Sequence, residues 1–130
     1  MSEQAIYGDA ACYGVRLINR SGNGALPVDE HDFAEAINRC VLVDKTMFIA
    51  DVLDADASVV ACCRPEGFGK SMNLSMLKAF LERSTVGQVD RGLFAGSQIW
   101  DAGCERYRDE SACYPVISLD FSGAAKCGAN

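Results

Sequence analysis

Histidine and long apolar runs are what this 130-residue chain most clearly lacks. The single histidine, His31, lies among acidic residues and has no partner histidine, so we expect a solvated helix residue rather than a catalytic base. No apolar run approaches the roughly 20 residues that a membrane-spanning helix needs. The first residues, MSEQAIYGDAA, have neither the basic nor the apolar region of a signal peptide. These absences argue against a membrane protein and favour a cytoplasmic location.

Positive charge is also scarce, because 12 Lys and Arg face 18 Asp and Glu and the net charge is −6. An acidic chain does not favour contact with a phosphate backbone, so nucleic-acid binding by this segment is disfavoured. The imbalance lies in residues 1–61, which hold 10 acids and 4 bases. Residues 64–83 carry four bases against two acids, and this local excess suits a phosphorylated small molecule.

The seven cysteines are an odd number and accompany no signal peptide, which indicates free thiols in a reducing compartment. Cys62 and Cys63 fall in an apolar run, where we expect them to pack as small apolar groups. Cys104, Cys113 and Cys127 are too widely spaced for a zinc knuckle. A cysteine-based metal or redox protein is therefore the weakest of the alternatives that the sequence leaves open.

Residues 1–28 are rich in Gly, Ser, Asn and Ala and predict a loosely ordered leader, whereas residues 29–130 show the periodicity of a folded domain. Apolar spacing predicts helices over residues 29–40, 45–53 and 70–83, with an extended segment at 41–43. Glycines predict turns around Leu93-Phe94, and the alternating charges of residues 100–112 predict a surface segment.

Two runs, residues 58–63 and 114–121, have the apolar, β-branched character of buried parallel strands. Because a long helical connection separates them, we expect an α/β fold with a parallel sheet and flanking helices. Two strands cannot form a stable sheet of this kind. Either the leader and the segment near Val41 supply further strands, or the chain is the front part of a larger domain, truncated just after a strand.

Between the first of these runs and the helix at 70–83 lies a loop that ends in Gly69-Lys70-Ser71. A phosphate-binding loop, of general pattern GxxxxGK[ST], needs a strand, a glycine loop and a helix in this order, whereas a Gly-Lys-Ser triplet alone commonly marks only a turn before a helix. The Lys70 ammonium would reach the β- and γ-phosphates, Ser71 would bind Mg²⁺, and the N–H groups of residues 67–71 would surround the β-phosphate. Arg64 stands where the pattern has its first glycine, so the loop is either degenerate or a variant in which Pro65 sets the turn.

The text RPEGFGKSMNLSML, residues 64–77, resembles the loop RPRRFGKS followed by LNLSML in the AAA-ATPase-like domain of bacterial and archaeal proteins. Further blocks match in the same order: VDKTMFI at residues 43–49, then LFAGSQIW and YPVISLDFS. The arginine-proline start is thus a feature of that family. Members often carry a PD-(D/E)XK nuclease-like region at the C-terminus, so such a region or a partner chain is an expected partner.

The resemblance implies a partial P-loop NTPase fold that binds ATP with Mg²⁺ through a variant Walker A loop. Its site residues would be Arg64, Gly67, Phe68, Gly69, Lys70 and Ser71, with Ser71 on the metal. The family's acidic strand, with a pattern like IDEYD, lies later than residue 130, and Asp120 belongs to an earlier strand, as a strand-end acid or a helix cap. Hydrolysis by this segment alone is therefore not expected.

Two departures support a different interpretation. Glu66-Gly67 replaces two arginines of the family loop, which removes positive charge beside the phosphates and adds a negative one, and Leu42 replaces a tyrosine. The alternative is a non-enzymatic remnant or interaction module that keeps the fold and binds no nucleotide. Asp44-Lys45, in the VDKT block, predicts a local ion pair or a helix start, and the family resemblance favours a place beside the nucleotide but assigns no role.

Overall fold

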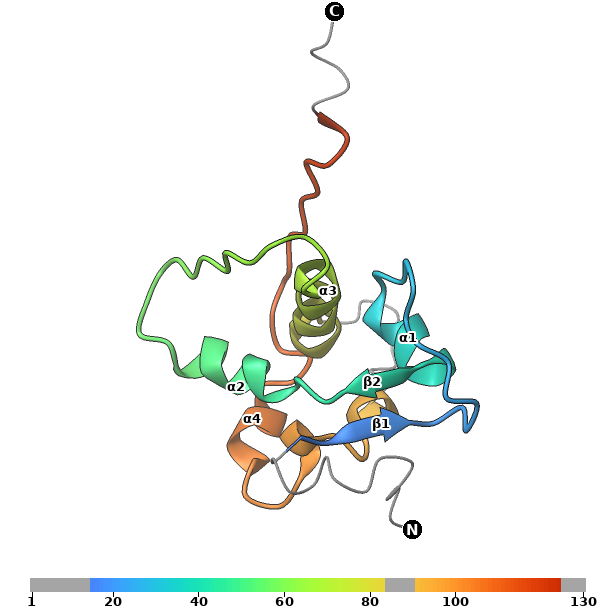
Figure 1. Cartoon of the computed structure of the whole chain (residues 1–130). Helices are drawn as coiled ribbons and strands as arrows, with labels where there is room; N and C mark the ends of the chain where they lie inside the picture. The colour runs from blue at the N-terminus through green and yellow to red at the C-terminus, as the bar shows by residue number, and fades with distance from the viewer. Residues whose placement is uncertain (1–14, 84–90, 125–130) are drawn as a thin grey trace, which may run out of the picture.

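A computed structural model describes residues 15–83 and 91–124 of the chain. Figure 1 shows a small mixed α/β unit in which short helices surround a two-stranded sheet. The elements in chain order are β1 (Leu17–Asn19), α1 (Phe33–Arg39), β2 (Val41–Val43), α2 (Met47–Asp54), α3 (Lys70–Leu81), the 3₁₀ turns η2 (Arg91–Phe94) and η3 (Gln98–Trp100), and α4 (Glu105–Asp109).

The sheet is formed by β1 and β2, which pair antiparallel with Ile18 opposite Leu42. Both of these side chains are buried. The leader and the segment near Val41 do supply strands, but these two strands pair with each other and do not extend a parallel sheet built on residues 58–63 and 114–121. The orientation was not anticipated, since we expected a parallel sheet and this pair is antiparallel.

The three predicted helices are confirmed, with ends that the local chemistry sets. The Asp32 carboxylate caps α1 by accepting a hydrogen bond from the Glu35 N–H at 3.1 Å, so the helix begins after the acidic run rather than inside it. The first helical residue, Phe33, donates its N–H to Ser75 Oγ of α3 at 3.0 Å. This bond and the packing of α1 on α3 place α3 across the middle of the molecule (Figure 1).

The core is an aromatic cluster drawn from four parts of the chain. Phe80 of α3 is fully buried, and its ring meets the Phe94 ring edge to face at 5.1 Å between centroids. Phe94 stacks on Phe33 at 5.3 Å, and Trp100 closes the cluster at 6.3 Å from Phe80. Aromatic pairs in these geometries add about 0.5–1.5 kcal/mol each beyond burial, so the cluster fixes α3 against α1 and the 3₁₀ turns.

The prediction of two buried parallel strands is wrong. Residues 58–63 are coil and exposed, with Val59 exposing 81% of its surface, and residues 115–121 are coil as well, with Ile117 exposing 87%. Within the described ranges, the second segment makes a single parallel bridge, between Tyr114 and Glu82. Apolar composition gives a segment strand propensity, but a strand forms only where a neighbour accepts its backbone hydrogen bonds.

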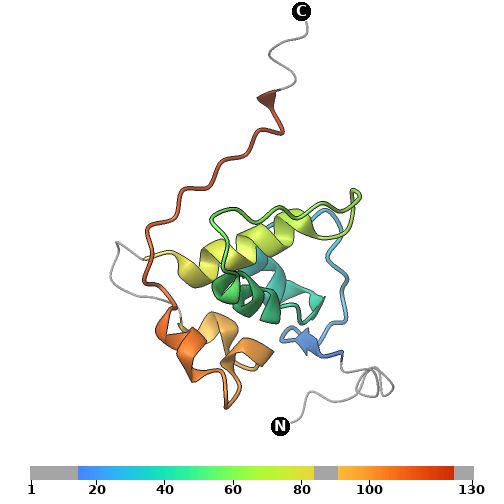
Figure 2. The same ribbon diagram turned by 90° about the vertical axis from the view of Figure 1, so that its left-hand side faces the viewer.

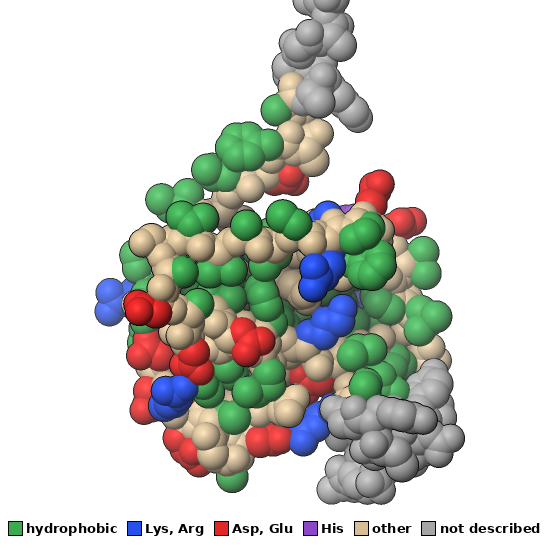
Figure 3. Space-filling view, turned by 60° about the vertical axis from the view of Figure 1, so that its left-hand side comes forward, with side chains coloured by type: hydrophobic (Ala, Val, Ile, Leu, Met, Phe, Trp, Pro, Cys, Tyr) green, Lys and Arg blue, Asp and Glu red, His purple; other side chains and the backbone are tan. Residues whose placement is uncertain are grey.

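Figure 2 shows the second of these segments, residues 115–124, running away from the helices, and Figure 3 shows hydrophobic side chains along that arm. Each segment lies next to one end of α3. The first leads through the loop into the N-terminus of the helix, and the second starts beside its C-terminus. Helix α3 is therefore held by its packing on α1 and α2 and not by a sheet.

Candidate functional site

The predicted phosphate-binding loop, residues 64–69, is an exposed turn that delivers the chain to α3 (Figure 1). Gly67 has φ +84° and Gly69 has φ +78°, both in the left-handed region that side chains disfavour. A Cβ built on Gly67 would meet no atom within 4 Å. The glycines are thus required by the backbone conformation of the turn rather than by close packing.

Gly69 is also the N-cap residue of α3, and it supplies no side chain to the helix end. The first backbone bond of the helix runs from the Asn73 N–H to the Gly69 carbonyl at 2.9 Å. The N–H groups of the first turn have no side-chain cap. Among the described residues, the 12-residue α3 therefore presents uncapped N–H groups and the positive end of its dipole at the loop.

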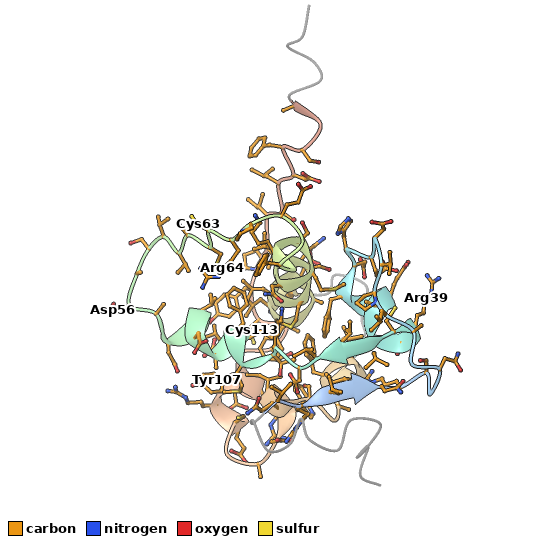
Figure 4. All side chains as sticks on the ribbon, in the orientation of Figure 1. Arg39, Asp56, Cys63, Arg64, Tyr107 and Cys113 are labelled. Carbon is orange, nitrogen blue, oxygen red and sulfur yellow. The ribbon has the colours of Figure 1, made fainter. Side chains whose placement is uncertain are left out.

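The two predicted cations of the loop are turned onto its own backbone. Lys70 Nζ donates a hydrogen bond to the Arg64 carbonyl, and an Arg64 guanidinium nitrogen donates to the Cys63 carbonyl at 3.1 Å. Both side chains are exposed, and Figure 4 labels Arg64 next to Cys63 on the coil that leads to α3. This hydrogen bond joins the two ends of the turn, six residues apart, so the Lys70 ammonium lies beside the first residue of the loop.

The other predicted residues of the loop are also exposed. Ser71 lies in the first turn of α3 with its side chain at the surface, and Phe68 exposes 59% of its surface. The Glu66 carboxylate forms no ion pair with any cation of the described ranges, so it does not neutralise Lys70 or Arg64. The structure thus brings Arg64, Gly67, Phe68, Gly69, Lys70 and Ser71 together in one turn and helix start.

A second lysine reaches this turn from elsewhere in the chain. Lys45, in the connection between β2 and α2, places Nζ 3.6 Å from the position that a Cβ on Gly69 would take. From the sequence we expected Asp44-Lys45 to form a local ion pair or a helix start, and the family resemblance favoured a place beside the nucleotide without giving Lys45 a role. The helix start is close, since α2 begins at Met47, but Asp44 and Lys45 form no ion pair in the part of the chain that the structure describes. The one signal in the sequence was the match of the whole VDKT block.

The neighbours of Lys45 form a clamp of hydrogen bonds. Asp44 Oδ1 accepts from the Thr46 N–H at 2.9 Å and from the Thr46 hydroxyl at 2.6 Å, while Asp44 Oδ2 accepts from the Gln98 N–H at 2.7 Å. Thr46 Oγ1 in turn accepts from the Ile99 N–H at 3.1 Å, and Thr46 is fully buried. The Asp44–Thr46 clamp therefore joins the start of α2 to η3.

Asp120 lies far from these groups in the chain and behaves as a local turn acid. Its carboxylate accepts a hydrogen bond from the Ser122 N–H at 2.8 Å, and this bond lowers the pKa of Asp120 below its ordinary value. The predicted strand before it is absent, and no helix is described after it, so within the described residues Asp120 is neither a strand-end acid nor a helix cap.

Cysteines and carboxylates form no metal centre among the described residues, where no group of three or more His, Cys, Asp or Glu could hold an ion. The prediction that Cys62 and Cys63 are buried is wrong, because both lie exposed on the coil before the loop. Cys40 is the buried thiol of the described ranges. None of the helices described there is long and apolar enough to span a membrane.

A family model described as "Predicted AAA-ATPase" matches residues 27–129 of the chain. The matched range includes the clamp, the loop, α3 and the second exposed apolar segment. No curated protein and no solved structure matches the chain.

Proposed function

The chain belongs to the AAA-ATPase-like family, and from that premise we propose that residues 64–71 bind ATP together with Mg²⁺. The observation that carries the proposal is the junction of the loop with α3. A glycine with positive φ caps the helix, no described side chain forms a cap hydrogen bond with the first N–H groups, and a lysine follows directly. Such a junction fits an anion with several oxygens, because backbone donors and the helix dipole converge on one point.

Each residue of the loop would contact a different part of the ligand, according to its chemistry. The N–H groups of residues 67–71 would hold the β-phosphate, and the Lys70 ammonium would exchange the Arg64 carbonyl for phosphate oxygens. The exposed Ser71 hydroxyl would bind Mg²⁺, which neutralises phosphate charge when it is bound. Arg64 would brace the turn through its contact with the Cys63 carbonyl or add a phosphate contact, and Phe68 contributes its backbone N–H.

The loop residues support binding of ATP, whereas hydrolysis of ATP needs further groups. In the two described ranges no hydrogen bond or ion pair brings a carboxylate to Lys70 or Ser71. An ATPase needs such a group to orient metal and water. We assign residues 29–130 to part of a P-loop domain and residues 1–28 to a leader that adds β1 to it.

Titration with a fluorescent ATP analogue in the presence of Mg²⁺ tests the proposal. Lys70→Ala should weaken binding by at least about tenfold, since a charge-assisted hydrogen bond contributes about 1.5–3 kcal/mol. Lys78→Ala is the matched control, because Lys78 lies on the same helix near its other end and is paired with Glu82. Equal affinity of the wild type and Lys70→Ala, or no binding by either, would contradict nucleotide binding through this loop.

One observation favours the alternative, a module that keeps the fold and binds no nucleotide. The Glu66 carboxylate stands in the loop without an ion-pair partner in the described part of the chain, where an incoming phosphate would meet its charge. Glu66→Arg discriminates between the two functions. Binding that appears only in this variant would identify a decayed loop, whereas binding by the wild type that rises several-fold in the variant supports the proposed function.

A further inference from the structure

The position of Lys45 beside Gly69 joins two segments that lie 24 residues apart in the sequence. The Lys45 ammonium is 3.6 Å from the point where a Gly69 side chain would begin, at the N-cap of α3. A cation at a helix N-terminus is the unfavourable arrangement, because the helix dipole already presents positive charge there. No carboxylate of the described ranges lies within ion-pairing distance of Lys45. The contact therefore gathers positive charge without a counter-ion.

Lys70 adds to the same excess. Its ammonium lies on the loop that Gly69 ends and contacts a carbonyl rather than a carboxylate. Two of the four lysines of the chain thus meet the positive end of α3, although the chain as a whole is acidic. A polyanion in the loop would turn this repulsion into attraction, since each cation gains a partner.

The Asp44–Thr46 clamp explains how Lys45 is presented. The residues on both sides of it are fixed by hydrogen bonds to each other and to η3, and Thr46 is fully buried. The Lys45 side chain is exposed and forms no hydrogen bond with the described residues, whereas the Lys45 carbonyl accepts one from the Phe48 N–H at 2.9 Å. The clamp fixes the backbone from which the lysine projects and leaves the ammonium free for a ligand.

From this geometry we propose that Lys45 is a second phosphate-binding cation of the site, supplied to the loop by the Asp-Lys-Thr block of the same chain. The inference rests on the proposed function and specifies it further: the ligand class is a nucleoside polyphosphate, and affinity rises with the number of phosphate charges. Asp44 and Thr46 are positioning residues that act through Lys45.

Titration of the full chain with fluorescent analogues of ATP and ADP tests the role of Lys45. Lys45→Met keeps the aliphatic stem and removes the charge, and it should weaken ATP binding about five- to tenfold, a loss in the range for a partly screened charge contact. The loss should be smaller for ADP, and the salt dependence of ATP binding should become shallower. Lys45→Arg keeps the charge and should bind within about twofold of the wild type.

Lys78→Met is the matched control, because it makes the same change in net charge about 12 Å further along α3 by the helical rise. Thermal unfolding of each variant checks the fold, and the midpoint of Lys45→Met should not fall, because Lys45 is exposed and its removal relieves repulsion with the helix dipole. Wild-type affinity in Lys45→Met, or an equal loss in Lys78→Met, overturns the role of Lys45 and leaves the proposed function standing. Absence of nucleotide binding in the wild type overturns both.

Discussion

The Asp44 carboxylate accepts a hydrogen bond from the Gln98 N–H at 2.7 Å, although 54 residues separate the two in the chain. Asp44→Ala removes this bond and both bonds to Thr46, and so leaves buried groups of the clamp without partners. We expect the free energy of unfolding to fall by about 2 kcal/mol. Urea denaturation measures it. Asp51→Ala, on the exposed face of α2, is the control and should change it by less than about 0.5 kcal/mol.

Phe80 is fully buried in the aromatic core, where it contacts the rings of Phe94 and Trp100. Phe80→Ala leaves a cavity among rings that approach it at 5.1 and 6.3 Å, and we expect a loss of about 3–5 kcal/mol in the free energy of unfolding. Chemical denaturation followed by Trp100 fluorescence reports it, because this ring contacts Phe80. Leu74, on the same helix, is 60% exposed, so Leu74→Ala should change the free energy of unfolding little. Similar losses for the two variants would contradict the packing of α3.

The positive φ angle at position 69 favours glycine over residues with a side chain. Gly69→Ala forces a side chain into φ +78°, which costs about 1–2 kcal/mol, while the added Cβ meets Lys45 only at ordinary contact distance. We expect lower stability and weaker nucleotide binding together. Gly69→Asn should be milder, because asparagine tolerates this region. Gly123→Ala, where φ is not positive and no atom lies within 4 Å, should change neither quantity.

The thiols test the coil at residues 58–63 directly. A short pulse of iodoacetamide on the native protein, followed by peptide mapping, should modify Cys62, Cys63 and Cys113 rapidly and Cys40 slowly, because only the last is buried. Labelling in denaturant supplies the reference rates. Protection of Cys62 and Cys63 in the native protein would mean that the segment is a buried strand after all.

Glu105 gives the chain a small acid sensitivity. The Gly103 N–H donates to both carboxylate oxygens, at 2.9 and 3.1 Å, and this lowers the pKa of Glu105. A depressed pKa stabilises the fold above the unfolded pKa, roughly 4.3, and that contribution is lost as the pH falls through the folded pKa. Glu105→Gln should therefore be less stable than the wild type near neutral pH and converge with it in acid. A constant difference across the pH range would contradict this assignment.

Helices were predictable from the sequence because their signals are local. The apolar spacing of α1, α2 and α3 and the capping acid Asp32 lie within the elements that they define. The glycines and Lys70 of the loop were likewise predictable, since one contiguous segment supplies them.

The pairing of β-strands was not predictable in the same way. Residues 58–63 and 114–121 have strand composition, yet whether they form strands depends on neighbours that no local pattern specifies. The contact of Lys45 with Gly69 was not predictable for a related reason, although the family resemblance had favoured a place for Asp44-Lys45 beside the nucleotide. Its approach to Gly69 depends on the clamp between Asp44 and Gln98, which bridges segments far apart in the chain.

The two exposed apolar coils described in the fold have a colloidal consequence. Each carries β-branched side chains and backbone donors that no strand occupies, so each is a template on which another copy can add a strand. The net charge of −6 opposes that encounter at low ionic strength. Raising the salt concentration screens the repulsion and leaves the apolar coils unopposed, so the protein should be most soluble in dilute buffer and should self-associate through these coils as salt is added.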